Sequence, residues 1–262
     1  LCGVEHLVGV PHKRGKYLTE SYDMQECMNH AYEPYVYAKI FEYITGVELT
    51  DMDGWSDLYY PEASEEEKAR IDSLLNQQGM NDYIVCSLHT SSLAKDWPLE
   101  YWEDLFKRLH QDGISLVLVG NDDDSIKLPT NVLDLRKKTN LLELGYVVKK
   151  ANLVINGSSL LFHVANGMKT PCIGLIGTEP PCRDTNKYVY TYIQSTAPCS
   201  PCDPLVGSQG FCENPYCMQE ISVEHVYKEI QTFMENRKEL VFSNHYIDAA
   251  WNDACNIWVK GM

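Results

Sequence analysis

The sequence predicts an α/β protein built around a doubly wound, mostly parallel sheet, and two observations support this prediction. From residue 83 onward, short apolar runs alternate with amphipathic stretches in the order strand, helix, strand. Short loops connect them, as in sheets whose parallel strands are joined by helices. The 262 residues are 44% hydrophobic, which is ample for a packed core. We therefore expect a Rossmann-like domain.

The predicted strands are short apolar runs of the kind that lie buried on both faces of a parallel sheet. They cover residues 83–88, 114–119, 132–135, 152–156 and 171–176.

The predicted helices have apolar residues three or four positions apart and begin at capping residues. We expect Asp96 to cap the first helix after residue 83, with Pro98 in its first turn and Gly113 ending it. Further helices are predicted over residues 35–44, 140–150 and 159–166 and in a long segment after Ser222.

A linker and a capped helix mark the predicted domain boundary. Residues 60–64 form the linker, and Ser64 precedes three glutamates that suit the first turn of a helix. We predict a partial N-terminal domain with its linker over residues 1–78 and a C-terminal domain over residues 79–262. The chain begins without Met, so we expect a trimmed or partial chain.

The charge of the chain argues against nucleic acid as a partner. Its net charge is −15, and no local cluster of Lys and Arg offsets this charge. Its apolar runs are much shorter than the roughly 20 residues that a membrane-spanning helix needs, which leaves peripheral membrane contact open. The sequence is silent on the oligomeric state.

Four of the ten cysteines fall within 19 residues and suggest a metal site. Cys199, Cys202, Cys212 and Cys217 would supply four soft ligands from a polar loop, which suits tetrahedral zinc or iron in a structural role. Two disulfides or free thiols are the alternatives. Cys86 and Cys172 lie in predicted buried strands, where thiols behave as small hydrophobes, and this favours a reducing, cytoplasmic location.

Three segments in fixed order resemble glycosyltransferase family 9, which contains the heptosyltransferases and autotransporter heptosyltransferase-like members. They are residues 89–98 (HTSSLAKDWP), 156–163 (NGSSLLFH) and 174–180 (GLIGTEP). The resemblance implies a GT-B fold, with residues 79–262 as the nucleotide-sugar domain and residues 1–78 on the acceptor side. It also implies inverting, metal-independent transfer of a sugar, such as heptose in lipopolysaccharide biosynthesis, from a nucleotide diphosphate sugar to a saccharide or protein acceptor.

The resemblance also suggests donor-binding residues. Lys95 would neutralise the diphosphate, and the hydroxyls of Thr90 and Ser91 would donate hydrogen bonds to it. The turn at Gly157, Ser158 and Ser159 offers backbone N–H groups at a helix start, which suits a phosphate. Asp122, Lys138 and His163 complete the predicted donor site.

Several of these residues have simpler interpretations. Lys95 and Lys138 can be solvated surface residues, Asp122 can belong to a solvated turn, and His163 can be a core histidine. The family's acidic position is occupied by Ser158, and its glycine position by Leu160.

The catalytic base is left unassigned because the family's acid lies in a Gly-rich N-terminal segment that has no match here. Its candidates are Glu5, His6, His12, Asp23, Glu26 and His30. Two alternatives to a transferase follow: a noncatalytic nucleotide-sugar-binding protein, and a sugar-nucleotide epimerase of the same fold.

Overall fold

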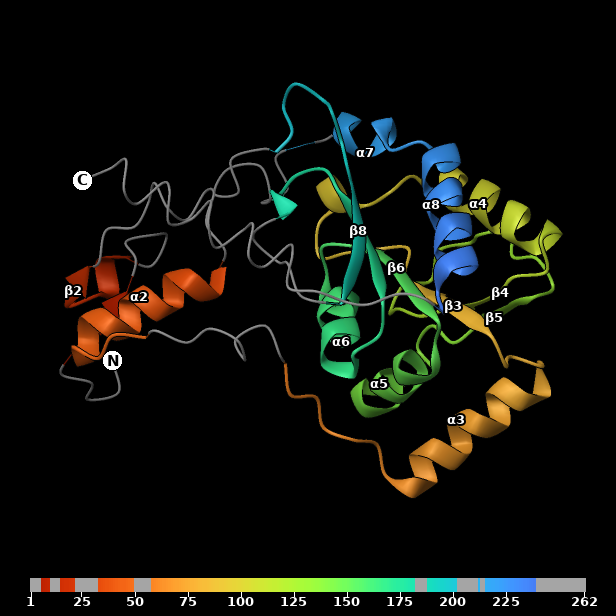
Figure 1. Ribbon diagram of the computed structural model, residues 1–262, viewed down its shortest axis with the longest axis horizontal. Coiled ribbons are helices and arrows are strands. Elements are labelled where there is room, and N and C mark those ends of the chain that lie inside the picture. The colour runs from red at the N-terminus through yellow and green to blue at the C-terminus, as the bar shows by residue number, and fades with distance from the viewer. Residues whose placement is uncertain are drawn as a thin grey trace. The chain divides into compact units, whose positions relative to one another are not determined.

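The computed structural model describes residues 6–9, 15–21, 33–49, 58–181, 188–201, 212 and 215–238 (Figure 1). The described residues fall into two compact units. Of the described residues, those between 6 and 49 belong to the first unit and those between 58 and 238 belong to the second.

The first unit contains a short pair of parallel strands and one helix. Strand β1 (Val8–Gly9) pairs with β2 (Glu20–Ser21), and the 3-10 helix η1 (Gly15–Tyr17) lies between them in sequence. Helix α2 (Glu33–Thr45) ends before Gly46, whose φ of 68° is the left-handed conformation that often terminates helices. This confirms the helix predicted over residues 35–44. Of the six candidate catalytic bases, His6 is described and the other five lie outside the described residues.

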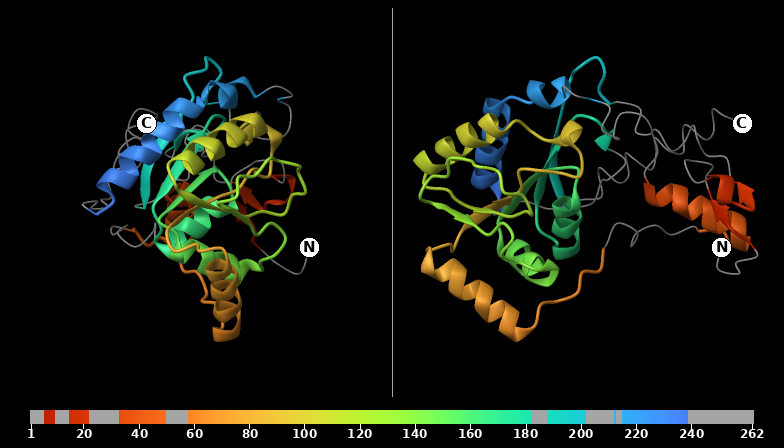
Figure 2. Two further views of the ribbon diagram at one scale, coloured as in Figure 1. Left: turned by 90° about the vertical axis from the view of Figure 1, so that its right-hand side faces the viewer. Right: turned by 180° about the vertical axis from the view of Figure 1, so that it is seen from behind.

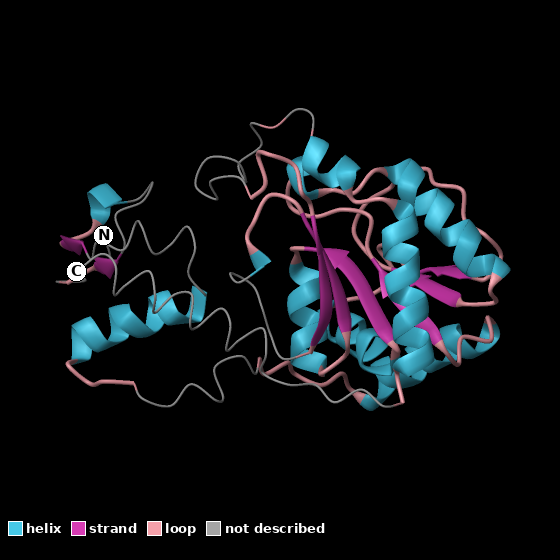
Figure 3. Cartoon of the chain, turned by 45° about the horizontal axis from the view of Figure 1, so that its top comes forward, coloured by secondary structure: helices cyan, strands magenta, loops and turns pink. Residues whose placement is uncertain are grey.

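A six-stranded parallel sheet forms the centre of the second unit (Figure 3). Its strands are β3 (Tyr83–Cys86), β4 (Ser115–Leu118), β5 (Val132–Asp134), β6 (Leu153–Gly157), β7 (Cys172–Ile176) and β8 (Val189–Gln194). They lie in the order β5-β4-β3-β6-β7-β8, and every neighbouring pair is parallel. Within this sheet, the strand that comes first in sequence, β3, is therefore central. This is the doubly wound order of dinucleotide-binding domains. The predicted fold class is confirmed.

Helices cover both faces of this sheet (Figure 2). Helix α4 (Leu99–Gln111) packs against α8 (Val223–Asn236) in one layer, and α5 (Leu141–Lys150) packs against α6 (Leu160–Met168) and α3 (Glu65–Gln77) in the other. Two shorter helical segments, η2 (Leu93–Lys95) and α7 (Tyr216–Glu220), lie in the connecting loops. None of the described helices is long and apolar enough to cross a membrane.

Three of the predicted helix starts are confirmed by their capping hydrogen bonds. Ser64 and Asn140 each form a capping box, with Glu67 and Glu143 respectively, and Ser222 accepts a bond from the backbone of His225. These signals succeed because a cap acts only on residues two or three positions away.

The predicted cap at Asp96 is wrong. Helix α4 starts at Leu99, and its N-cap residue is Pro98, which has no side chain able to form the capping bond. The Asp96 carboxylate accepts instead from the backbone N–H of Thr90, at 2.7 Å, in the loop that follows β3. Asp96 therefore shapes the loop rather than the helix.

Strand β8 was not predicted. Its sequence, Val-Tyr-Thr-Tyr-Ile-Gln, suits a strand, but it forms the edge of the sheet and is only partly buried. The signal of continuous apolar residues that identifies the central strands is therefore weak here.

The segment that precedes the sheet is attached firmly to its helices. Arg70 of α3 donates to Glu143 of α5 at 2.6 Å, and Glu143 is buried. The Tyr60 ring packs so closely on α5 that a Cβ at Gly145 would lie 2.4 Å from the ring atom Cε1. Gly145 thus permits this contact.

The predicted domain boundary lies between residues 78 and 79, after α3. In the structure, α3 lies within the second unit.

Candidate functional site

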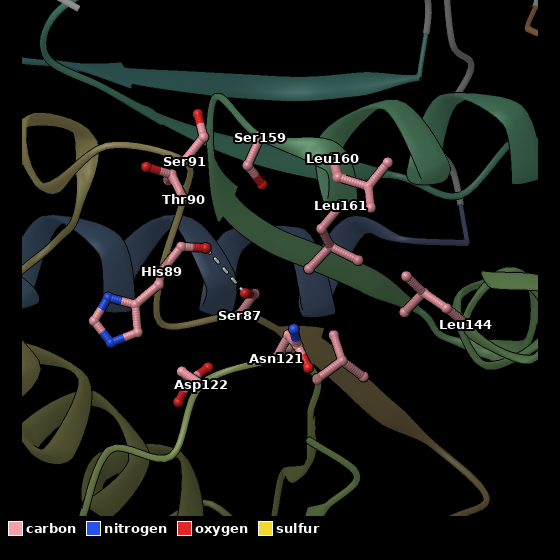
Figure 4. Close-up of a pocket in the computed structure, with 12 residues that line it drawn as sticks. Ser87, His89, Thr90, Ser91, Asn121, Asp122, Leu144, Ser159, Leu160 and Leu161 are labelled. Carbon is pink, nitrogen blue, oxygen red and sulfur yellow. Dashed lines mark hydrogen bonds between the residues drawn. The ribbon is translucent and has the colours of Figure 1, made fainter. Parts of the chain in front are cut away.

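A pocket of about 440 Å³ opens at the carboxyl ends of β3, β4 and β6 (Figure 4). The chain continues from β3 to its neighbour β4 on one side and returns later to β6 on the other, so the loops after β3 and β6 diverge here. Doubly wound sheets bind their ligands in this crevice. The lining residues are Ser87, His89, Thr90, Ser91, Val119, Gly120, Asn121, Asp122, Leu144, Ser159, Leu160 and Leu161.

The pocket has one polar side and one apolar side (Figure 4). The side chains of Thr90, Ser91 and Ser159 lie near the start of α6, and Leu144 and Leu161 lie on the other side of the pocket. Ser159 is the N-cap residue of α6, whose first backbone N–H groups lack partners within the helix. The arrangement suits a ligand with an anionic group at the helix start and a less polar body.

His89 joins two of the loops around the pocket. Its Nδ1 lies 2.7 Å from Asp96 Oδ2, and its Nε2 lies 2.6 Å from Asp124 Oδ2. Burial lowers the pKa of His89, but hydrogen bonds to Asp96 and Asp124 and the nearby charge of Asp122 outweigh it, so the pKa is raised. Through these two bonds, His89 links the loop after β3 to the loop after β4.

We expect Asp124→Asn to lower the pKa of His89, because it removes one of the two carboxylates that favour the imidazolium. The folded-state pKa lies above the ordinary 6.5, so this stabilising contribution is complete below pH 6.5 and is lost as the pH rises through the folded pKa. An NMR titration of the imidazole measures the change. Asp123→Asn is the matched control, since Asp123 is 82% exposed and pairs with Lys137 instead. An unchanged His89 pKa in Asp124→Asn contradicts the prediction.

The predicted Asp122 lines the pocket but is held by Arg136. Arg136 Nη1 lies 2.6 Å from Asp122 Oδ1, while its Nη2 lies 2.8 Å from Asp134 Oδ2. The hydrogen bonds that Arg136 donates to Asp134 and to Asp122 raise the pKa of Arg136 further, against the effect of burial. Asp122 Oδ2 is buried and has no hydrogen-bond partner among the described residues. Asp122 thus keeps one oxygen that no described protein group satisfies.

Glu179 brings together two of the predicted donor residues. It follows β7 and is 7% exposed. Its Oε1 accepts from Lys95 Nζ at 2.6 Å, and its Oε2 accepts from Ser158 Oγ at 2.7 Å. Lys95 and Ser158 therefore face Glu179 rather than line the pocket.

The remaining predicted residues lie at different depths. Gly157 ends β6, and a Cβ there would lie 3.1 Å from the carbonyl oxygen of Lys95 and 3.2 Å from Thr90 Cγ2, so glycine allows the two loops to meet. His163 is exposed on α6, so it is not a core histidine. Lys138 is also exposed and donates to the backbone carbonyl of Asp134. Neither lines the pocket.

The proposed metal ligands are only partly described. Cys217 is buried against Gly177, Cys212 is half-buried and Cys199 is exposed, whereas Cys202 lies outside the described residues. Within the described ranges, no group of three or more His, Cys, Asp or Glu side chains is arranged to hold a metal ion. The four-cysteine site therefore stays a prediction.

Sequence reasoning missed several pocket residues, among them His89, Asn121 and Leu144, and it missed the central position of Glu179. His89 stands directly after one predicted strand and Glu179 lies in the loop after another, and these positions were the available signal. Their partners come from loops that are distant in sequence. His89 and Asp124 are 35 residues apart, and Lys95 and Glu179 are 84 residues apart.

Solved structures with the same fold include the family 9 glycosyl transferase from Veillonella parvula, with a TM-score of 0.68 and 16% identity, covering 89% of this chain and 68% of that one. The E. coli ADP-heptose lipopolysaccharide heptosyltransferase II follows with a TM-score of 0.60 and 17% identity, covering 90% and 72%. The iron-containing dodecameric glycosyltransferase TibC from enterotoxigenic E. coli has a TM-score of 0.52 and 17% identity, covering 62% and 48%.

No curated protein sequence matches the chain. The family model for glycosyltransferase family 9 (heptosyltransferase) matches residues 37–204. This range covers more than half of the chain and contains the whole pocket. The chain therefore belongs to glycosyltransferase family 9.

Proposed function

We propose that the chain binds a nucleoside diphosphate sugar in the pocket and takes part in transferring its sugar to a saccharide or protein acceptor. The observation that carries the proposal is the position of the pocket, at the carboxyl ends of β3, β4 and β6 and beside the start of α6, in a member of a sugar-transferring family. Figure 4 shows the side chains of Thr90, Ser91 and Ser159 on one side of it.

The chemistry of this side supports a diphosphate. Hydroxyl and backbone N–H donors form charge-assisted hydrogen bonds with phosphate oxygens, and the positive end of a helix dipole favours an anion. Asp122 supplies an acceptor of the kind that binds ribose or sugar hydroxyls, while Leu144 and Leu161 supply apolar surface. We propose ADP as the first nucleotide to test because the solved TibC complex contains ADP-D-β-D-heptose.

The finer features of the reaction are part of this proposal. We propose transfer with inversion, a heptose among the donor sugars, and an acceptor hydroxyl deprotonated by a base outside the pocket residues named above.

One observation favours a second function, nucleotide-sugar binding without transfer. Ser158 occupies the family's acidic position and donates to Glu179 instead of presenting a carboxylate of its own.

Placing a carboxylate in the pocket is the direct test of binding. In Ser159→Asp the new side chain is also a preferred N-cap residue, so α6 keeps its start while a negative charge meets the diphosphate. We expect ADP binding to weaken at least tenfold, which corresponds to about 1.4 kcal/mol. Isothermal titration calorimetry measures the affinity.

The matched control is Ser222→Asp, the same substitution at the exposed N-cap of α8, outside the pocket. It should bind ADP as the wild type does. Equal affinities of all three proteins, or no binding of ADP and UDP by the wild type, would reject the pocket as the donor site.

Product analysis separates the two functions once binding is established. With ADP-heptose, a lipopolysaccharide acceptor and a peptide acceptor, a transferase yields a glycosylated product and free ADP. A binding protein retains intact donor. Release of an isomerised sugar nucleotide without any acceptor would instead indicate the epimerase chemistry.

We also propose a structural zinc or iron held by Cys199, Cys202, Cys212 and Cys217, and a cytoplasmic location. The Cys-x-x-Cys spacing and the iron in TibC support the metal, and the buried thiols of Cys86 and Cys172 support a reducing compartment. Elemental analysis of the purified protein tests the first proposal, because less than stoichiometric zinc and iron would reject it. Cell fractionation tests the second.

A further inference from the structure

The cations around the pocket already have partners in the described loops. His89 lies between Asp96 and Asp124, and Arg136 pairs with Asp122 and Asp134. The side chains of Lys137 and Lys138 are bound to Asp123 and to a backbone carbonyl, respectively. An anionic ligand therefore meets paired cations, and its affinity depends on which ion pair it can open.

The pair of Lys95 with Glu179 is placed to respond to such a ligand. The two side chains are 13% and 9% exposed, so water screens them little. Glu179 also accepts from Ser158, which is the residue directly before the α6 N-cap Ser159. The Glu179 carboxylate is thus bonded to Lys95 and to Ser158. These are two of the residues predicted to bind the diphosphate of the donor.

A phosphate and a carboxylate compete for the same donors. Both accept charge-assisted hydrogen bonds from an ammonium group, and the flexible four-carbon stem of lysine can turn its ammonium from one acceptor to another. Lys95 does not line the pocket while it faces Glu179, although its backbone carbonyl lies close to Gly157 at the end of β6.

We propose that Glu179 is an internal counter-ion of Lys95, which the diphosphate of an incoming ligand displaces. The inference rests on the proposed function, because it assigns a role within the same donor site. It predicts that Glu179 weakens the binding of nucleoside diphosphates and thereby favours release of the product nucleotide. A residue that positions Lys95 for the phosphate would have the opposite effect.

The test compares ADP affinities of the wild type and Glu179→Gln by calorimetry. Glutamine has nearly the same shape, and its amide oxygen can still accept from Lys95 or Ser158, but it carries no charge to compete with phosphate. We expect ADP to bind about tenfold more tightly to Glu179→Gln, whereas adenosine, which has no phosphate, should bind equally to both proteins.

Two controls isolate the interaction. Glu224→Gln removes an equal charge from the exposed face of α8, where Glu224 pairs with Arg108, and it should leave ADP affinity unchanged. In a Lys95→Met background, Glu179→Gln should lose most of its effect, because the lysine that Glu179 holds is absent.

The outcomes separate this inference from the proposed function. Unchanged or weaker ADP binding by Glu179→Gln overturns the counter-ion role but leaves the donor site standing if the wild type binds ADP. Failure of the wild type to bind ADP and UDP removes both. Should Glu179→Gln not fold, Glu179→Asp serves instead. Its carboxylate is one methylene shorter, so we expect its contact with Lys95 to lengthen and its competition with phosphate to weaken. ADP binding should again tighten, and no tightening overturns the inference.

Discussion

Replacing Trp97 with Ala is expected to destabilise the second unit by about 3–5 kcal/mol, the usual cost of removing a large buried aromatic side chain. Trp97 is 3% exposed, and its indole N–H donates to the backbone carbonyl of Ile221 at 2.8 Å. Its ring meets Tyr101 and Trp102 edge to face, with centroids 5.6 and 4.9 Å apart. The substitution removes the packing, the ring contacts and a bond between segments 124 residues apart.

Urea unfolding followed by far-UV circular dichroism measures this loss as a lower transition midpoint. Trp97→Phe keeps an aromatic ring and loses the indole N–H, so it should cost clearly less than Trp97→Ala. At temperatures where both variants are folded, ADP affinity should match the wild type, because Trp97 does not line the pocket. A selective loss of ADP binding without loss of stability would show that Trp97 acts on the ligand.

Arg136→Met is expected to cost about 3 kcal/mol, at the lower end of the range for breaking a buried ion pair. The variant leaves the carboxylates of Asp122 and Asp134 without their cation, and their side chains are 14% and 30% exposed. The greater exposure of Asp134 places the expected cost at the lower end. The neighbouring Lys137→Met is the matched control. Lys137 and its partner Asp123 are 44% and 82% exposed, so this change should cost at most about 1 kcal/mol.

The difference between Arg136→Met and the wild type should shrink in acid. Burial raises the pKa of Asp134, but hydrogen bonds and the charge of Arg136 outweigh it, so the folded-state pKa lies below the ordinary 3.8. The stabilising contribution is therefore present above pH 3.8 and is lost as the pH falls through the folded pKa. Urea unfolding of both proteins at pH 7 and at pH 3 tests this. A difference that is equal at both pH values would contradict an ionic origin.

The local signals in the sequence predicted most of the elements of the second unit. Apolar periodicity indicated β3, β4, β6 and β7, and the capping residues Ser64, Asn140 and Ser222 marked helix starts that the structure confirms. These signals act over a few residues, so they can be recognised without knowledge of the fold. They fail where the burial is partial, as in β8, or where a tertiary partner takes the capping group, as Asp96 does for Thr90 and His89.

The predicted residues of the candidate site divide into those that line the pocket and those that do not. Thr90, Ser91, Asp122 and Ser159 were predicted from the family resemblance and their loops after strands, and they line the pocket because the carboxyl ends of parallel strands share one edge of the sheet. Lys95 and Ser158 were predicted in the same way, but they face Glu179 instead of lining the pocket. Donor binding by any of these residues stays a prediction.

By itself, the sequence determined the alternation of strands and helices, the starts of three helices and the loops from which the site is built. Only the tertiary structure decided which charges meet: Lys95 with Glu179, Arg136 with Asp122, and His89 with Asp96 and Asp124. The physical reason is that the order of strands in the sheet brings together loops separated by many residues. An ion pair depends on the final distance between two side chains, and no local periodicity encodes that distance.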